Sequence, residues 1–209
     1  LNDESSVKGA MKTAFNTLNN RRVLLGVTGG IAAYKSAELT RRLQDQGADV
    51  RIVMTRSATE FITPLTMQAL SRHPVHLDLL NPDTELVMGH IELARWADLI
   101  LIAPASANFL ARFASGHGDD LLTTVCLAAE CPVAIAPAMN QAMWSKPATQ
   151  DNQSILVHRG VHLLGPDSGL QACGEIGAGR LLDIDPLIQR VSGLFDTGKL
   201  QGRTVLITA

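Results

Sequence analysis

The sequence has few of the features that mark several common classes of protein. Its 209 residues include three cysteines, and none belongs to a zinc-type pair, so we predict neither a disulfide framework nor a metal site. This cysteine usage is typical of a reducing, cytoplasmic protein. Lysine and arginine total 18 against 20 acidic residues. The chain therefore lacks the basic surface of a nucleic-acid-binding protein.

Long apolar runs and targeting signals are also missing. No stretch approaches the roughly 20 apolar residues that cross a bilayer, so no membrane partner is expected. The first residues, LNDESSVKGAMKTAFNTLNN, begin acidic and have no hydrophobic segment of a secretory signal. We interpret residues 1–20 as a tail, in part foreign to the natural chain, which could start at Met11.

The chain does have a regular alternation of two kinds of segment. Short β-branched runs alternate with amphipathic stretches of helical length, which predicts an α/β fold with a doubly wound parallel sheet, flavodoxin-like or Rossmann-like, and helices on both faces. Gly47 should follow the end of the first helix, and Thr63 and Pro64 should start the second. The expected strands are residues 21–28, 48–55, 75–80, 97–106, 131–140 and 161–167, and the expected helices are 31–46, 63–71, 119–130, 150–160 and 183–195.

The segment GVTGGIAAYKS, residues 26–36, joins the first strand to the first helix. It matches neither the G-x-G-x-x-G fingerprint nor a Walker A loop. Thr55 and Ser57 also stand where a dinucleotide-binding protein would place a carboxylate. A tight turn and a phosphate cradle explain the glycines equally well, and the two hydroxyls favour the phosphate of a mononucleotide.

Two further strand ends carry small and amide residues. Ser106 and Asn108, in APASANFLARF, would at least cap a helix. Met139 and Asn140 open the segment MNQAMW, in which Met143 and Trp144 have the spacing of core residues. Because ligands bind beyond the carboxyl ends of parallel strands, three such ends together favour a cofactor site.

One histidine and one cysteine are candidates for chemistry. His90 lies in GHIELARWAD, after a loop and just before the central strand, so it faces the same edge and could be a general base or merely a helix-capping residue. Cys173 lies in the glycine-rich segment of residues 165–180, interpreted as a flexible loop. It is either incidental or carried by that loop to a site elsewhere. The remaining histidines are expected in loops or on the surface: His73, His76, His117, His158 and His162.

Five segments, GGIAAYK, HIELARWAD, PASAN, PAMNQAMW and ACGEIGAGR, resemble in this order the homo-oligomeric flavin-containing cysteine decarboxylases. The resemblance covers residues 21–182. Within the family, the chain looks most like the domains of bacterial coenzyme A biosynthesis that decarboxylate 4′-phosphopantothenoylcysteine. Such a domain precedes a phosphopantothenate–cysteine ligase in a bifunctional protein. LQGRTVLITA, residues 200–209, is similar to the first strand of that ligase.

The resemblance implies an organisation and a set of site residues. Residues 21–197 would form the FMN-binding decarboxylase domain, and 198–209 the linker and first strand of a truncated ligase. The FMN phosphate would lie against Gly29, Gly30, Ile31, Thr55 and Ser57, and the isoalloxazine ring against Ser106, Ala107, Asn108, Phe109 and Ala138.

For the substrate, the resemblance implies three catalytic residues. They are His90, Asn140, which would hold the cysteine carboxylate, and Cys173, a proton donor on a flap that closes over the substrate. Ala172 and Arg95 would also contact the substrate, Arg95 at its phosphate. Family members are trimers or dodecamers built from trimers, so a homo-oligomer is expected.

The reaction implied is redox-neutral decarboxylation. The thiol is oxidised to a thioaldehyde, CO₂ leaves, and the resulting enethiol is reduced to 4′-phosphopantetheine. Three alternatives have a similar fold: an oxidative decarboxylase that stops at the enethiol, a flavin prenyltransferase, and a flavin-binding regulatory subunit that inhibits a phosphatase. The motifs PAMN and ACGEIG do not suit a prenyltransferase, and Cys173 argues against the oxidative enzyme. The regulatory subunit could dispense with the catalytic set that is present here.

Overall fold

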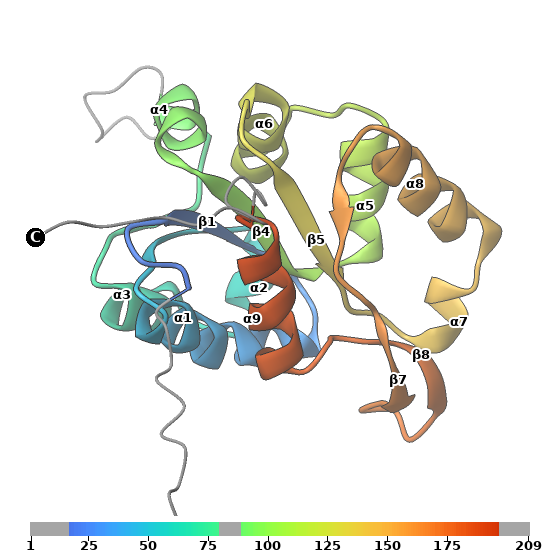
Figure 1. The fold of residues 1–209 in the computed structure, drawn as a ribbon. Helices are drawn as coiled ribbons and strands as arrows, with labels where there is room; N and C mark the ends of the chain where they lie inside the picture. Colours follow the sequence, from blue (N-terminus) through green and yellow to red (C-terminus); the bar gives the residue numbers. More distant parts are fainter. Residues whose placement is uncertain (1–16, 80–88, 197–209) are drawn as a thin grey trace, which may run out of the picture.

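A computed structural model describes residues 17–79 and 89–196. Six parallel strands form a central sheet in the order β3-β2-β1-β4-β5-β6, with β4 buried along its whole length (Figure 1). The predicted doubly wound parallel sheet is confirmed. The strands are β1 (Arg22–Val27), β2 (Asp49–Met54), β3 (Val75–His76), β4 (Leu99–Ala105), β5 (Val133–Pro137) and β6 (His162–Leu163).

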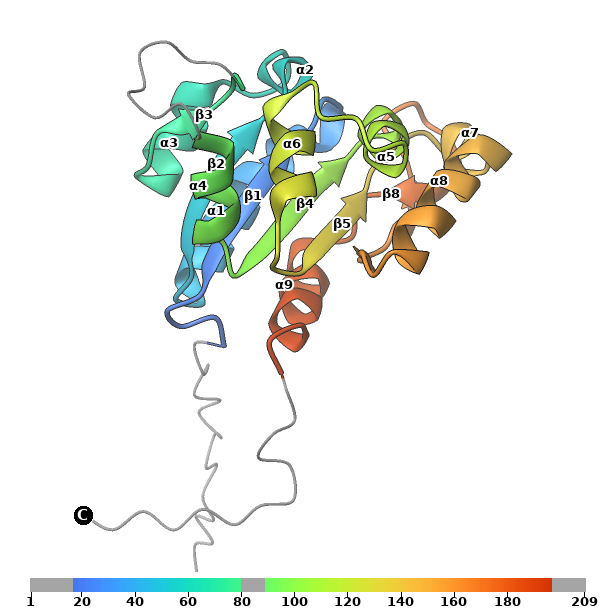
Figure 2. The same ribbon diagram turned by 90° about the horizontal axis from the view of Figure 1, so that it is seen from above.

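Helices cover both faces of this sheet, as Figure 2 shows. Successive residues of a strand point to opposite faces, so Leu24 and Leu25 belong to two separate hydrophobic cores. One core packs against α1 (Lys35–Asp45), α3 (Pro64–Ser71) and α9 (Ile184–Gly193). The other packs against α4 (Gly89–Trp96), α5 (Ala107–Ala114), α6 (Leu121–Ala128) and α8 (Pro147–His158).

The predicted helix ends have a clear chemical basis. Gly47 follows the C-cap of α1 with φ of +90°, its N–H bonds Gln44 O, and the N–H of Ala48 bonds Leu43 O. This is a Schellman motif, which requires the left-handed conformation that glycine adopts without strain. At α3, the Thr63 hydroxyl accepts from the N–H of Thr66 at 3.2 Å, and Pro64 begins the helix. Both predictions are confirmed.

Several boundaries differ from the prediction. The first helix is preceded by a separate 3₁₀ turn, η1 (Ile31–Tyr34), whose N-cap Gly30 has no side chain to hold the first turn. The helix predicted at 150–160 begins at Pro147, because proline suits the first helical position. Three helices were not predicted: α4, and the short helices α2 (Arg56–Thr59) and α7 (Gln141–Trp144) after strand ends. For α5, only the capping residue at its start was predicted, and not its bounds.

The glycine-rich segment differs most from the prediction. It forms an antiparallel hairpin of β7 (Asp167–Leu170) and β8 (Ile176–Arg180), and the strand expected at 161–167 is limited to β6. Glycines at 169, 177 and 179 hide the alternation that normally predicts strands. Met143, expected in the core, is 48% exposed, whereas Trp144 does pack against the core.

In the part of the chain that the structure describes, no helix is both long and apolar enough to cross a membrane. Residues 1–16 of the expected tail, the expected ligase strand at 198–209 and Leu80 of the third expected strand lie outside the described residues.

Candidate active site at the carboxyl edge of the sheet

The carboxyl ends of β1 and β4 are joined side by side. The Thr28 hydroxyl, fully buried after β1, donates to Pro104 O at 2.7 Å and accepts from the N–H of Ser106 at 2.9 Å. The chain leaves β1 toward β2 and leaves β4 toward β5, in opposite directions across the sheet. Ligands of doubly wound sheets bind at such a switch point.

The glycine turn after β1 packs closely on the segment after β2. A Cβ atom on Gly29 would lie 2.4 Å from the Ser57 hydroxyl oxygen, so only glycine fits there. A Cβ on Gly30 would meet no atom within 4 Å. The hydroxyls of Thr55 and Ser57 lie 3.1 Å apart, and Thr55 caps α2. Glycine backbone and a pair of hydroxyls thus lie together at this edge, a combination that suits an anion.

The segment after β4 is partly structural. The Ser106 hydroxyl accepts from the N–H of Phe109 at 3.3 Å, so Ser106 caps α5, as the simpler interpretation predicted. The Phe109 ring is 3% exposed and packs on Phe113 in the core. The Phe109 ring is therefore part of the core, while Ala107 is half-buried and Asn108 exposed at the edge.

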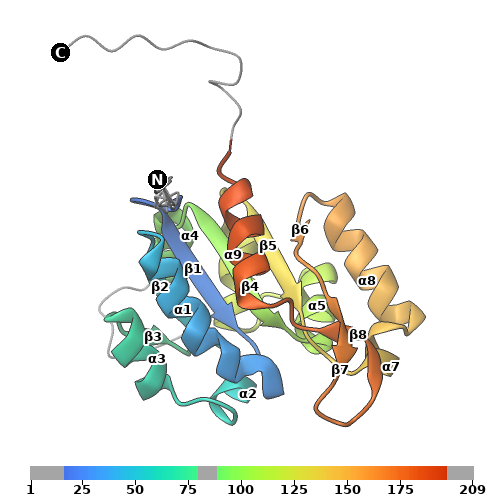
Figure 3. The same cartoon turned by 60° about the horizontal axis from the view of Figure 1, so that its bottom comes forward.

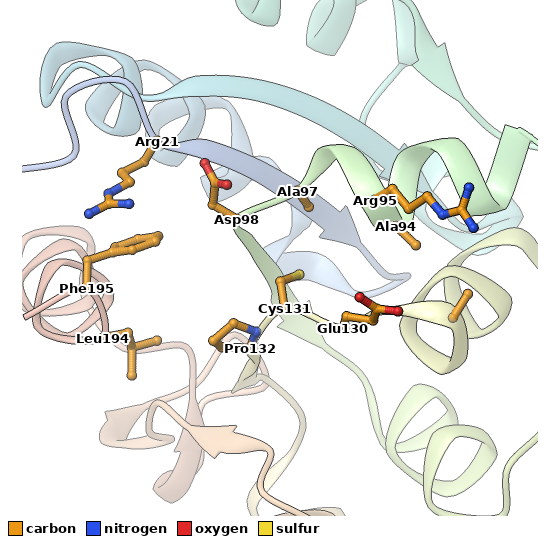
Figure 4. Close-up of a pocket in the computed structure, with 11 residues that line it drawn as sticks. Arg21, Ala94, Arg95, Ala97, Asp98, Glu130, Cys131, Pro132, Leu194 and Phe195 are labelled. Atoms are coloured by element: carbon orange, nitrogen blue, oxygen red, sulfur yellow. The ribbon is translucent and has the colours of Figure 1, made fainter. Parts of the chain in front are cut away.

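His90 and Arg95 lie at opposite ends of α4. Because α4 precedes β4 and runs back along the sheet, its first turn with His90 lies near the carboxyl edge. Arg95 is in the last turn and lines a cavity of about 490 Å³ with Asp98, Cys131 and Phe195 (Figure 4). That cavity lies at the amino ends of β1, β4 and β5, so one chain does not bring Arg95 to the candidate site.

Asn140 and Cys173 meet after β5, where the β7–β8 hairpin lies against α7 (Figure 3). The Asn140 Oδ1 accepts from the N–H of Ala142 at 2.8 Å, which caps α7 and fixes the orientation of the amide. Its Nδ2 then points to the hairpin and donates to Cys173 Sγ at 3.4 Å. This contact supports the interpretation in which the glycine-rich segment brings Cys173 to a site elsewhere in the fold.

The hairpin is fixed to the loop after β5 by its backbone. The N–H of Met139 donates to Gly179 O at 2.9 Å, and a Cβ on Gly179 would lie 2.5 Å from Met139 O. Gly179 also has φ of +131°, which few other residues adopt. At the far end of the hairpin, Leu170 and Ile176 pair across the strands and remain 65% and 76% exposed.

Sequence reasoning missed two residues that join this cluster, Gln171 and Glu175. The Gln171 Oε1 accepts from the N–H of Gln141 at 2.9 Å, while its Nε2 donates to Met139 O and Ala178 O, each at 3.4 Å. The Glu175 Oε2 accepts from Asn140 Nδ2 at 2.8 Å. Both residues flank Cys173 in the segment QACGE, which is the only local signal that could have found them.

The three cysteines differ in exposure. Burial raises the pKa of the Cys126 thiol far above its ordinary value, and burial also raises the pKa of Cys131. Cys173 is exposed on the hairpin. Cys126 and Cys131 therefore behave as core or rim side chains, and Cys173 is the accessible thiol.

Comparisons with known proteins agree with this geometry. The family model described as Flavoprotein matches residues 11–196. The chain belongs to the flavoprotein family. It is 55% identical over 193 residues to the coenzyme A biosynthesis bifunctional protein CoaBC of Vibrio vulnificus. The matched region covers 92% of this chain and 48% of that protein. The chain thus spans about half the length of the curated relatives it matches.

Two solved flavoprotein-like structures superpose closely on this chain. One is a cysteine-to-serine mutant of PPC decarboxylase complexed with pantothenoylaminoethenethiol, with TM-score 0.74 and 32% identity over 86% of this chain and all of that one. The other is the FMN-dependent cysteine decarboxylase SpaF, with TM-score 0.71 and 35% identity over 83% and 99% of the two chains. The sheet, the glycine turn and the hairpin therefore lie in a fold shared with cysteine decarboxylases.

Proposed function

We propose that this chain catalyses the FMN-dependent decarboxylation of 4′-phosphopantothenoyl-L-cysteine to 4′-phosphopantetheine and CO₂ in coenzyme A biosynthesis. The observation that carries the proposal is the Asn140–Cys173 contact at the carboxyl edge, where an amide donor and an accessible thiol meet. The likeness to CoaBC and to PPC decarboxylase supports this substrate. The full bifunctional activity is not proposed for this chain.

The residues present fit FMN. The Gly29 backbone packs on Ser57, and the space beside Gly30 is open, so Gly30, Ile31 and the Thr55 hydroxyl would hold the phosphate. The half-buried Ala107 and Ala138 and the exposed Asn108 would border the ring. When bound, FMN supplies hydride acceptance from the thiol-bearing carbon and hydride return at the end of the cycle.

The chain's own residues position the substrate and move its protons. Asn140 Nδ2 would hold the cysteine carboxylate until CO₂ leaves, since the cap on α7 fixes the direction in which that amide donates. His90 would accept the thiol proton as the substrate is oxidised to the thioaldehyde. Loss of CO₂ then leaves electrons that spread onto sulfur as an enethiolate.

Cys173 would complete the cycle by donating a proton to the enethiol carbon that lost CO₂, while hydride returns to the neighbouring carbon that bears sulfur. A solved PPC decarboxylase with a cysteine-to-serine change holds pantothenoylaminoethenethiol, which is the species expected when such a proton donor is missing. The hairpin would exclude water from this species while it closes over Asn140.

The placement of His90 and Asn140 supports a site that is shared between copies of the chain. Figures 1 and 2 show α4 and α7 on opposite sides of the molecule, with α6 and α5 between them. Ile31, Tyr34, Phe61 and Leu65, which follow β1 and β2, are 48% to 74% exposed. We infer a homo-oligomer, a trimer or a dodecamer of trimers, in which the His90 edge of one copy meets the Asn140 edge of the next.

Mixing two inactive variants tests the shared site. His90→Asn and Asn140→Asp are each expected to give a folded, yellow, inactive protein. Co-refolded or co-expressed, they should regain activity, because some interfaces would combine the intact His90 edge with the intact Asn140 edge. No recovery in mixed oligomers of confirmed composition would contradict a shared site.

The overall function is tested by turnover of 4′-phosphopantothenoyl-L-cysteine, with the product identified by mass. Formation of 4′-phosphopantetheine supports the proposal, whereas an accumulating enethiol product would favour the oxidative decarboxylase. A yellow protein that leaves the substrate untouched and inhibits a phosphatase would favour the regulatory subunit. A cytoplasmic location and the absence of nucleic-acid and membrane partners stay predictions.

A further inference from the structure

The Asn140 amide already has a carboxylate partner from its own chain. A primary amide has two N–H donors. Toward the hairpin, Asn140 Nδ2 donates to Glu175 Oε2 at 2.8 Å, and its remaining contacts are longer, to Cys173 Sγ at 3.4 Å and to Gln171 Oε1 at 3.5 Å. The amide cannot turn to offer another donor, because its Oδ1 accepts from the N–H of Ala142. A ligand carboxylate must therefore displace one of these partners.

Glu175 is the partner that can leave. Gln171 is held by the N–H of Gln141 at 2.9 Å and by two carbonyl groups, so its release would break three further contacts. Cys173 offers a weak acceptor and no charge. Glu175 is exposed, has a long side chain, and two carboxylates cannot both occupy one donor without strong repulsion.

We propose that Glu175 is a specificity-determining residue that occupies the carboxylate position on Asn140 until a substrate carboxylate displaces it. The inference rests on the proposed function, because it takes the ligand of Asn140 to be a carboxylate. After CO₂ is lost, the product has no group that competes with Glu175. The Asn140–Glu175 contact then re-forms while the product is still bound. Binding of a carboxylated ligand therefore requires this contact to break, whereas binding of a decarboxylated ligand does not.

The expected size of this effect is modest. A charge-assisted hydrogen bond at an exposed site favours the paired state by a small factor, so Glu175 would occupy Asn140 in most but not all molecules. Apparent affinity falls in proportion to the fraction of the competent state. Removing Glu175 should therefore raise the affinity for a carboxylated ligand by about two- to tenfold and change the affinity for its decarboxylated counterpart by less than about twofold.

The test uses two ligands that cannot be oxidised at sulfur. These are 4′-phosphopantothenoyl-L-serine, which has the carboxylate, and 4′-phosphopantothenoyl-ethanolamine, which lacks it. Dissociation constants are measured by calorimetry on the FMN-loaded wild type, Glu175→Ala and Glu175→Gln. Glu175→Ala should bind the serine ligand more tightly than the wild type does. The affinity of Glu175→Gln should be intermediate, because a neutral amide oxygen competes for Asn140 less than a carboxylate does.

Two controls separate local competition from general charge. Glu130→Ala removes an equally exposed carboxylate beside the cavity at the opposite edge and should change neither constant. In an Asn140→Ala background, Glu175→Ala should no longer tighten the serine ligand, since the contested donor is gone. An equal gain with and without Asn140 would overturn the proposal.

The remaining outcomes are also decisive. If Glu175→Ala weakens the serine ligand, leaves it unchanged, or shifts both ligands by the same factor, Glu175 only shapes the hairpin and the proposal is wrong. If the wild type binds neither ligand, the proposed substrate class fails first, and the role of Glu175 falls with it. Binding of both ligands by the wild type keeps the proposed function whatever Glu175→Ala does.

Discussion

The side-chain amide of Asn140 lies 3.4 Å from the sulfur of Cys173, although 33 residues separate them in the chain. The contact joins the end of a central strand to the turn of the β7–β8 hairpin. Each partner alone has a simple structural explanation, a helix cap for Asn140 and a surface thiol for Cys173. Their meeting at the carboxyl edge is what indicates a site.

Replacement of Asn140 by aspartate tests the carboxylate-binding role. Aspartate still caps α7, but it loses both Nδ2 donors and places a second carboxylate beside Glu175. We expect Asn140→Asp to retain FMN, to show faster hydrogen–deuterium exchange across residues 171–179, and to weaken substrate binding by roughly tenfold or more. Turnover at the wild-type rate would contradict the assignment.

The glycine turn offers a matched pair of variants. Gly29→Ala would force the backbone after β1 away from Ser57, so it should lower both the free energy of unfolding and FMN affinity. Gly30→Ala meets no protein atom, so it should leave the stability of the apoprotein unchanged and weaken FMN alone. The melting temperatures of both variants with and without FMN separate an effect on stability from an effect on FMN affinity. Unchanged FMN affinity in Gly30→Ala would favour a tight turn that does not hold a phosphate.

His76 predicts a pH dependence of stability. Burial, and secondarily the positive charge of Arg51, lower the pKa of His76 below its ordinary value, while Glu92 partly opposes them. Below about pH 6.5 the unfolded chain therefore takes up a proton more readily than the folded one. The contribution of His76 to stability is complete above that pH, is lost as the pH falls from there to the lowered pKa of the folded protein, and does not change further below it.

His76→Gln should make the acid side of this profile flatter, as measured by urea unfolding between about pH 7.5 and about pH 5, a window from roughly one unit above to roughly one and a half units below the ordinary histidine pKa. His117→Gln is the control, because His117 is exposed. An equal loss of stability on acidification in wild type and His76→Gln would show that other groups govern the profile.

The layers of the fold could be predicted because strong local signals specify them. Apolar strands such as β4 and caps such as Thr63 are decided within a few residues. The β7–β8 hairpin was missed because glycine removes the alternation of side chains, and its pairing depends on contacts with the loop after β5. Apart from their place beside Cys173, no local pattern marks Gln171 or Glu175, whose partners at Gln141 and Asn140 lie 30 and 35 residues away.

Some of the residues predicted for the site lie where the sequence placed them, and others do not. Strand-end residues such as Thr55, Ser106 and Asn140 lie at the carboxyl edge, because parallel strands bring their ends together. Arg95 was assigned by motif position alone, and helix α4 carries it to the other edge. Phe109 turns into the core because the helical period of α5 sets its direction, and only the cap of that helix was predicted.

The most direct test is an anaerobic single turnover of the FMN-loaded Cys173→Ser variant and the wild type with 4′-phosphopantothenoyl-L-cysteine. In the wild type the flavin absorbance should bleach and return, with CO₂ lost and 4′-phosphopantetheine identified by mass. In Cys173→Ser it should bleach and stay bleached, with the enethiol as the product, because the proton donor is missing. Full recovery of the flavin band and formation of 4′-phosphopantetheine by Cys173→Ser would contradict the account.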